Sequence, residues 1–182
     1  MSCFTCKVFG EENTDCQGVL QQCENDDDFC ATQIESSRIG NDNRVIVRKR
    51  CMPAANKNVC RPEPMKLDCT KLILSLYSEC CFEDGCNSNG LKIPADNTTK
   101  NGHQCPTCFV ENSNTCPCSK TELKECTGNA NTCLEFSGHV QRPEDVEKLY
   151  AFKGCVDGNL CKTDLSKLPG CEVGSDAKLT CT

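Results

Sequence analysis

Cys80-Cys81-Phe82-Glu83-Asp84-Gly85-Cys86-Asn87 closes a series of eleven cysteines that opens with Cys3-Phe4-Thr5-Cys6. A second series of ten cysteines opens with Cys105-Pro106-Thr107-Cys108 and repeats the spacing of the first. After each CxxC, the gaps are nine, six, six, twenty and eight residues in the first series. In the second they are nine, seven, six, twenty-one and five, when Cys116 is left out. The agreement indicates that the chain is two copies of one disulfide-stapled module.

The cysteine content predicts the compartment. The chain has 21 cysteines in 182 residues, a density typical of disulfide scaffolds. Because disulfides persist in oxidising compartments, we expect a secreted, extracellular protein. Each copy has only about 80 residues, and the chain has no Trp, 7 Phe and 2 Tyr, so each apolar core is small. Four or five disulfides per copy, each contributing about 2–4 kcal/mol, would supply the missing stability.

Charge and hydropathy argue against nucleic-acid binding and against a membrane span. The formal net charge is -6 and the sequence pI is near 5.0, whereas general nucleic-acid binding needs a basic surface. No apolar run approaches the roughly 18 residues of a membrane span. We therefore expect no nucleic-acid partner and no membrane span.

A polar segment without cysteines separates the two copies. The predicted boundaries are residues 1–87 for the first domain, 88–104 for the linker and 105–182 for the second domain. Polar and turn-forming residues dominate the linker, as in connections between compact domains. The linker carries the sequon Asn97-Thr98-Thr99, so Asn97 is a predicted glycosylation site.

Short strands are predicted between the cysteines. Residues 44–51 are β-branched at their centre and partly alternate in polarity, and residues 134–138 and 149–155 are predicted to pair across a polar loop. Residues 70–78 fit a strand, and a short helix nearly as well; their brevity and flanking cysteines favour the strand. The sequence thus predicts an all-β, disulfide-rich fold with long loops.

The cysteine frame is similar to that of a known family. The CxxC opening and the Cys-Cys-x4-Cys-Asn ending together resemble the three-finger domain of the lymphocyte antigen 6 and urokinase receptor superfamily. The resemblance covers both halves and implies two tandem three-finger, snake-toxin-like domains. Two tandem modules look most like the gamma-type phospholipase A2 inhibitors, and residues 101–106, 125–128 and 152–156 are of the kind such chains carry. The amphibian sodefrin precursor-like pheromones are a second resemblance.

The resemblance also implies a disulfide pairing. In the first domain it joins Cys3–Cys30, Cys6–Cys16, Cys23–Cys51, Cys60–Cys80 and Cys81–Cys86. In the second it joins Cys105–Cys133, Cys108–Cys118, Cys126–Cys155 and Cys161–Cys181. Cys69, Cys116 and Cys171 fall outside the family frame. Cys116 and Cys171 could pair with each other, which leaves Cys69 as the candidate free thiol; the alternative is a rearranged third finger with a Cys60–Cys69 bond.

Motifs that could carry chemistry have simpler interpretations. The CxxC pairs could be zinc half-sites or redox dithiols, but His103 and His139 are the only histidines, and structural disulfides are favoured. Hydrolysis would need a nucleophile, a histidine base and an orienting acid. The acidic run 24–28 lacks the spaced ligands of a calcium loop and is interpreted as a solvated turn. We therefore expect no catalytic, metal or cofactor site.

The basic side of residues 44–51 is the surface feature that most suggests contact with a partner. Arg44, Arg48 and Arg50 share this side, and their charges either solvate a strand edge or steer an acidic protein partner.

We expect a non-enzymatic binding protein, in which disulfides fix a rigid base for contact loops. The favoured partner is a secreted phospholipase A2, and the alternative is a cell-surface receptor bound by a pheromone or signalling ligand. A third interpretation is a structural protein cross-linked through spare cysteines, with homo-oligomers possible.

Overall fold

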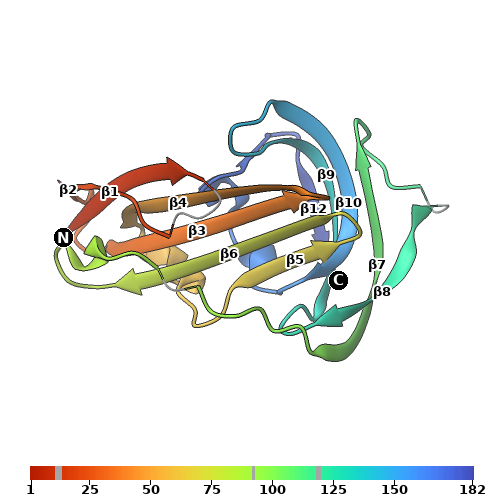
Figure 1. The fold of residues 1–182 in the computed structure, drawn as a ribbon, viewed down its shortest axis with the longest axis horizontal. Helices are drawn as coiled ribbons and strands as arrows, with labels where there is room; N and C mark the ends of the chain where they lie inside the picture. Colours follow the sequence, from red (N-terminus) through yellow and green to blue (C-terminus); the bar gives the residue numbers. More distant parts are fainter. Residues whose placement is uncertain (11–13, 92, 118–119) are drawn as a thin grey trace.

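The computed structural model describes residues 1–10, 14–91, 93–117 and 120–182 as strands joined by turns and short 3-10 helices (Figure 1). The predicted all-β, disulfide-rich fold is therefore confirmed. The first half contains β1 (Ser2–Phe9), β2 (Val19–Gln22), β3 (Phe29–Ile39), β4 (Asp42–Met52), η1 (Ala54–Val59), β5 (Met65–Cys69), β6 (Leu72–Cys81) and η2 (Cys86–Ser88).

The second half repeats this plan with a different ending. It contains β7 (Lys100–Glu111), β8 (Glu122–Thr127), β9 (Thr132–Gln141), β10 (Glu147–Val156), η4 (Leu160–Lys162), η5 (Leu165–Lys167), β11 (Glu172–Val173) and β12 (Lys178–Cys181). None of the helices among the described residues is long and apolar enough to cross a membrane.

One 12-stranded sheet runs through both halves. The first half has the order β5-β6-β3-β4-β1-β2, with antiparallel neighbours. In the second half, β10 pairs with β9 on one edge and with β7 on the other, and β8 extends the sheet beyond β7. The halves join where β5 also pairs with β10, with Cys69 opposite Gly154. In Figure 1, β7 and β10 consequently run across the ends of the first-half strands.

The strand predictions are confirmed. Residues 44–51 lie in β4, residues 134–138 and 149–155 lie in the paired strands β9 and β10, and most of the 70–78 segment lies in β6. In β4, Val45 and Val47 are buried on one face and Ile46 on the other. A strand in the interior of a sheet that is covered on both faces needs apolar residues at successive positions, which is why alternation in β4 is only partial.

Nine disulfides hold the described residues, and eight of them join the pairs that the resemblance implies. The first half has Cys3–Cys30, Cys6–Cys16, Cys23–Cys51, Cys60–Cys80 and Cys81–Cys86. The second half has Cys105–Cys133, Cys126–Cys155 and Cys161–Cys181. Each CxxC motif therefore sends its two cysteines to different partners, as structural cysteines do.

The ninth disulfide corrects the expected pairing. Cys108 bonds to Cys116 instead of Cys118, which itself lies outside the described residues. Because Cys116 is occupied, it cannot pair with Cys171, and both Cys69 and Cys171 remain free thiols. Both thiols are buried. Burial raises the pKa of the Cys69 thiol to about 11, which keeps it protonated at neutral pH.

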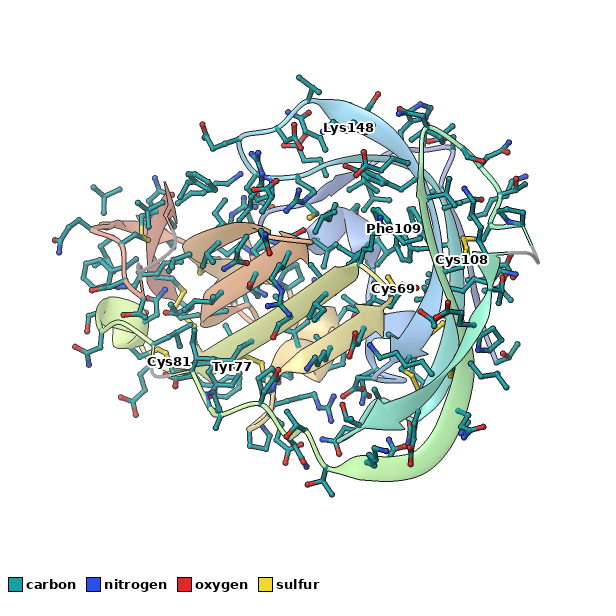
Figure 2. The ribbon with its side chains drawn as sticks, turned by 45° about the vertical axis from the view of Figure 1, so that its right-hand side comes forward. Cys69, Tyr77, Cys81, Cys108, Phe109 and Lys148 are labelled. Atoms are coloured by element: carbon teal, nitrogen blue, oxygen red, sulfur yellow. A yellow bond between two sulfur atoms is a disulfide. The ribbon has the colours of Figure 1, made fainter. Side chains whose placement is uncertain are left out.

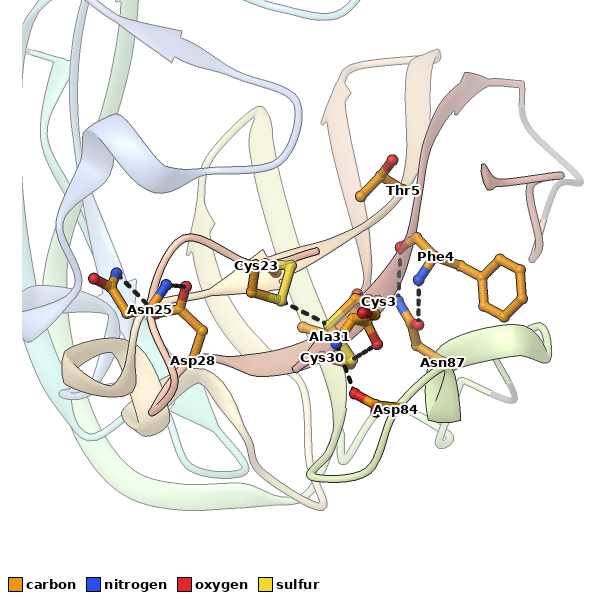
Figure 3. Close-up of a disulfide and its surroundings, with 12 residues drawn as sticks. Cys3, Phe4, Thr5, Cys23, Asn25, Asp28, Cys30, Ala31, Asp84 and Asn87 are labelled. Carbon is orange, nitrogen blue, oxygen red and sulfur yellow. Dashed lines mark hydrogen bonds between the residues drawn. A yellow bond between two sulfur atoms is a disulfide. The ribbon is translucent and has the colours of Figure 1, made fainter. Parts of the chain in front are cut away.

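Asn87, the last residue of the Cys-Cys-x4-Cys-Asn ending, locks the base of the first half (Figure 3). Its side-chain carbonyl accepts the N–H of Phe4 at 2.9 Å, and its amide donates to the Phe4 carbonyl at 2.9 Å and to the Ala31 carbonyl at 3.4 Å. An asparagine supplies the donor and the acceptor that this buried site needs, because its amide carries both. The Cys3–Cys30 and Cys81–Cys86 disulfides lie in the same sulfur-rich cluster.

The main apolar core is shared between the two halves. Its residues include Leu67 and Leu74 of the first half and Phe136 and Phe152 of the second. The rings of Phe136 and Phe152 stack on each other, with their centroids 4.7 Å apart. Cys69 belongs to the same cluster, on β5 at the junction with β10 (Figure 2). Two small modules that cannot each bury a large core thus bury one together.

Candidate interaction surfaces

The basic side of β4 faces the second half of the chain over much of its length. Arg44 donates from Nη1 to the carbonyl of Pro143 at 2.8 Å, and its Nε contacts the Asp42 carboxylate. Arg50 donates from Nη2 to the carbonyl of Lys167 at 2.5 Å and from Nε to the Gln33 side chain at 2.9 Å. Burial, with Arg48 nearby, lowers the pKa of Arg50 to about 10.

These contacts change the expected role of the basic face. Arg44 and Arg50 bind backbone carbonyls of the same chain, so two of the three residues expected to meet a partner protein serve the junction between the halves. Arg48 lies between them on the same side of β4 and is half-buried. It pairs directly across the strands with the exposed Lys7 of β1. Arg48 and Lys7 are therefore the cations through which this face could meet a partner.

Two buried charged residues clamp the halves together. Glu35 of β3 accepts the backbone N–H groups of Gly170 and Cys171, each at 2.8 Å. Arg142, at the end of β9, donates to the hydroxyl and carbonyl oxygens of Ser37 at 3.0 and 2.7 Å, and to the Asp42 carboxylate at 2.8 Å. Every one of these bonds crosses from one half to the other, so they fix the relative orientation of the domains.

Sequence reasoning missed Glu35 and Arg142. Each lies in a stretch of mixed polarity, and nothing in the spacing of charges distinguishes a buried carboxylate from an exposed one. One weak signal was available for Glu35. Glu35 lies between Ile34 and Ser36, and a charged residue in a strand must either face solvent or find bonding partners.

An apolar cavity of about 70 Å³ lies at the junction, lined from the first half by Leu67, Leu72 and Leu74 and from the second by Leu134, Phe136, Val140, Phe152 and Val173, among others. An engineered cavity that accepts benzene measures about 150 Å³. The junction cavity is therefore a packing void, because it is too small for an organic ligand of that size.

A polar groove of about 480 Å³ opens on the same junction, beside Arg61, Asn129, Asp157 and Lys162. Asp157 is buried and forms an ion pair with Arg61 at 2.5 Å. Its other oxygen accepts the N–H and the amide of Asn159 at 2.8 and 2.9 Å. The charge of Asp157 is thus compensated within the chain.

The residues considered for catalysis or metal binding are otherwise engaged. His139 is half-exposed on β9, and its Nδ1 lies 2.8 Å from the Asp176 carboxylate. His103 Nε2 lies 3.5 Å from Cys133 Sγ, which is already in a disulfide. Among the described residues, sulfurs cluster closely enough to hold a metal in separate places: Cys3, Cys23 and Cys51 in the first half, and Cys105 with Cys133 or with Cys126 and Cys155 in the second. All of these cysteines belong to disulfides and lack the thiolate that metals require.

The acidic turn 24–28 and the linker are exposed at most of their described positions. In the acidic turn 24–28, Asp28 is buried and its carboxylate accepts the N–H and amide of Asn25, at 3.1 and 3.3 Å. In the linker, Asn97 is exposed, and its side-chain oxygen accepts the N–H of Thr99 at 3.0 Å. The Asn97 side chain is thus on the surface, where a modifying enzyme can reach it.

The sequence profile of the u-PAR/Ly-6 domain matches this chain twice, over residues 1–89 and 101–179. Curated relatives match over about half of the chain. They include the urokinase plasminogen activator surface receptor of Aotus trivirgatus (31% identity over 88 residues), protein RoBo-1 of Rattus norvegicus (33% over 89 residues) and a phospholipase A2 inhibitor of the gamma type from Elaphe quadrivirgata (31% over 93 residues). These matches cover 48%, 49% and 50% of this chain and 25%, 35% and 44% of the relatives, respectively, so the matched region spans less than half of each relative.

Among solved structures, the crystal structure of mouse TEX101 aligns with 100% of this chain and 98% of its own, at 17% identity and a TM-score of 0.40.

Proposed function

Because the chain belongs to the u-PAR/Ly-6 domain family, we propose that it is a secreted, non-enzymatic binding protein that inhibits a secreted phospholipase A2 by protein–protein contact. The similarity to gamma-type phospholipase A2 inhibitors of two Elaphe species supports the choice of partner. The density of disulfides supports secretion, since nine such bonds require an oxidising compartment. The proposal also assigns the chain no catalytic step of its own.

The observation that carries the proposal is the rigid junction of the two domains. The β5–β10 pairing, the buried Glu35 and Arg142 clamps and the shared core hold both modules in one orientation. A binding protein gains affinity when its surface is ordered before contact, because less conformational entropy is lost on binding. A two-domain unit of this kind presents a broad surface without a hinge that the partner would have to order.

The proposal is tested with the oxidised protein and a panel of secreted phospholipases A2. We expect at least one enzyme to bind with a saturable isotherm in biolayer interferometry and to lose hydrolytic activity toward phospholipid vesicles in the same concentration range. The matched control is the reduced and alkylated protein, which has the same sequence without its fold.

Three outcomes would contradict the proposal. Inhibition by the reduced and alkylated control would show that the fold is not needed. Absence of binding across the panel would favour the alternative, a signalling ligand that binds a cell-surface receptor. Intrinsic hydrolysis of the vesicles by the protein alone would contradict the non-enzymatic assignment.

A further inference from the structure

Apolar side chains gather on the surface at the base of the first domain, away from the junction. Val19 and Leu20 of β2 are 64% and 56% exposed, and Phe82, in the Cys81–Cys86 loop, is 57% exposed. The structure describes seven exposed large apolar residues, and Leu20 and Phe82 belong to two neighbouring segments. Val19 projects from the other face of β2, because consecutive side chains in a strand alternate. A cluster of this kind on a small secreted domain marks a surface for contact with another molecule.

The Cys81–Cys86 loop, which carries Phe82, packs against β1 and β2. Leu20 pairs across the strands with Phe4, and a Cβ placed on Gly85 would lie 3.4 Å from the Phe4 ring and 3.6 Å from the Leu20 side chain. The loop is tied to β1, because Ser2 donates to Asp84 at 2.7 Å and accepts the N–H of Gly85 at 2.8 Å. Figure 3 shows Phe4 directed outward beside Asn87, with Asp84 at the same base.

Acidic residues surround this patch on the chain. Glu83 and Asp84 follow Phe82 directly and are exposed. The exposed Glu24, Asp26 and Asp27 follow β2, whose last residue, Gln22, pairs with Ser2. One cation is already present: Lys57 Nζ lies 5.4 Å from the centroid of the Phe82 ring. The Phe82 ring thus already holds an ammonium group, and two exposed carboxylates follow it in the chain.

We propose that this base patch, formed by Leu20 and Phe82 with the adjoining carboxylates, docks a protein segment that presents an apolar side chain flanked by Lys or Arg. Apolar contact would supply the affinity, and the acidic rim would select a basic partner and accelerate its approach. The same rim disfavours the anionic surface of a membrane, since like charges repel. The inference rests on the proposed function and names the surface through which binding occurs.

A display selection on the intact protein tests the patch without a known partner. Short random peptides are selected on the wild-type protein, and the enriched peptides are measured against two double variants. Leu20→Ser with Phe82→Ser removes the patch, whereas Leu123→Ser with Val146→Ser removes two equally exposed residues elsewhere, at 74% and 67% exposure. Thermal melting and disulfide mapping establish that each variant is folded.

We expect enriched peptides to combine Lys or Arg with aromatic or aliphatic residues. Their affinity should fall about tenfold or more, or about 1.4 kcal/mol, in the patch variant and stay within about twofold in the control. If Phe82→Ser does not fold, Leu20→Ser alone and the surface variant Glu83→Lys replace it, with Glu122→Lys as the charge control.

Four outcomes would overturn the proposal. The selection could enrich acidic peptides, the peptides could bind both variants equally, or no enriched peptide could depend on the patch. The fourth is patch-dependent binding to phosphatidylcholine vesicles in place of peptides.

The same variants separate this inference from the proposed function. A phospholipase A2 that binds the wild-type protein and both double variants equally would leave the function intact and remove the patch. Peptides that bind through the patch, with no binding of any phospholipase A2, would support the patch and contradict the proposed function.

Discussion

The carboxylate of Glu35 accepts the backbone N–H of Cys171 at 2.8 Å, although 136 residues separate the two. The second oxygen of the same carboxylate accepts the N–H of Gly170 at 2.8 Å. Gly170 itself cannot carry a side chain, because an added Cβ would lie 2.6 Å from a methyl carbon of Ile46. The first domain thus holds the third-finger backbone of the second in close contact with β3 and β4.

Replacing Glu35 with Ala should weaken folding strongly. The substitution leaves two buried N–H groups without an acceptor, at about 1–3 kcal/mol each, so we expect the free energy of unfolding to fall by about 2–6 kcal/mol. Urea unfolding with the disulfides intact measures the change. Glu147→Ala, an exposed control, should change stability by less than about 0.5 kcal/mol. An equal effect of the two substitutions would show that the clamp contributes nothing.

Charge reversal should separate the two roles within the basic face. Arg50→Glu removes the bonds to Gln33 and Lys167 and places a carboxylate near a carbonyl oxygen, so we expect a loss of about 1–3 kcal/mol. Arg48→Glu should leave the free energy of unfolding within about 0.5 kcal/mol. If Arg48 contacts an acidic partner, the same substitution should slow association at low ionic strength. Equal destabilisation by both variants would place Arg48 in the junction as well.

The two buried thiols should not react in the folded protein. Burial is the main cause that raises the pKa of Cys69 to about 11 and the pKa of Cys171 well above its usual value, so little thiolate exists at neutral pH. We expect a maleimide to label neither residue in native buffer and both in denaturant, as mass spectrometry of the peptides would show. Native labelling of Cys69 would instead indicate that the β5–β10 junction opens.

Filling the junction cavity should stabilise the protein. A void of about 70 Å³ corresponds to at most about 1.7 kcal/mol of lost packing, at about 24 cal/mol per Å³. Val173→Ile adds one methylene toward this space, and we expect a gain of up to about 1 kcal/mol in thermal or urea unfolding. Val146→Ile, on the surface, is the matched control and should have no effect. A loss of stability in the Val173 variant would show that the cavity cannot take the added group.

Alkaline titration should report on Tyr150. Burial and, second, Glu111 raise the pKa of this phenol to about 12. Because the folded pKa is raised, the stability contributed by the neutral phenol is complete below pH of about 10 and is lost as the pH rises toward 12. The ultraviolet difference between wild type and Tyr150→Phe should therefore titrate near pH 12. A midpoint near 10 would mean that the ring is solvated.

Cysteine spacing and polarity patterns determined much of this fold. The duplicated cysteine frame indicated two modules, and the resemblance it carries implied eight of the nine disulfides, because family geometry fixes which cysteines meet. Strands β4, β6, β9 and β10 were predictable because β-branched and aromatic residues concentrate there. Spacing could not choose between Cys116 and Cys118 as partner of Cys108, since loops of eight and ten residues differ by only about 0.2 kcal/mol in closure entropy.

Only the tertiary structure decided which polar residues are buried and which apolar residues are exposed. Alternation in residues 44–51 assigned Arg44 and Arg50 to one side of a strand, but the second domain covers that side through distant backbone carbonyls. Likewise, Leu20 and Phe82 resemble core residues in sequence and lie on the surface. A local pattern specifies the two faces of a strand, whereas the packing of the two domains determines which face meets solvent.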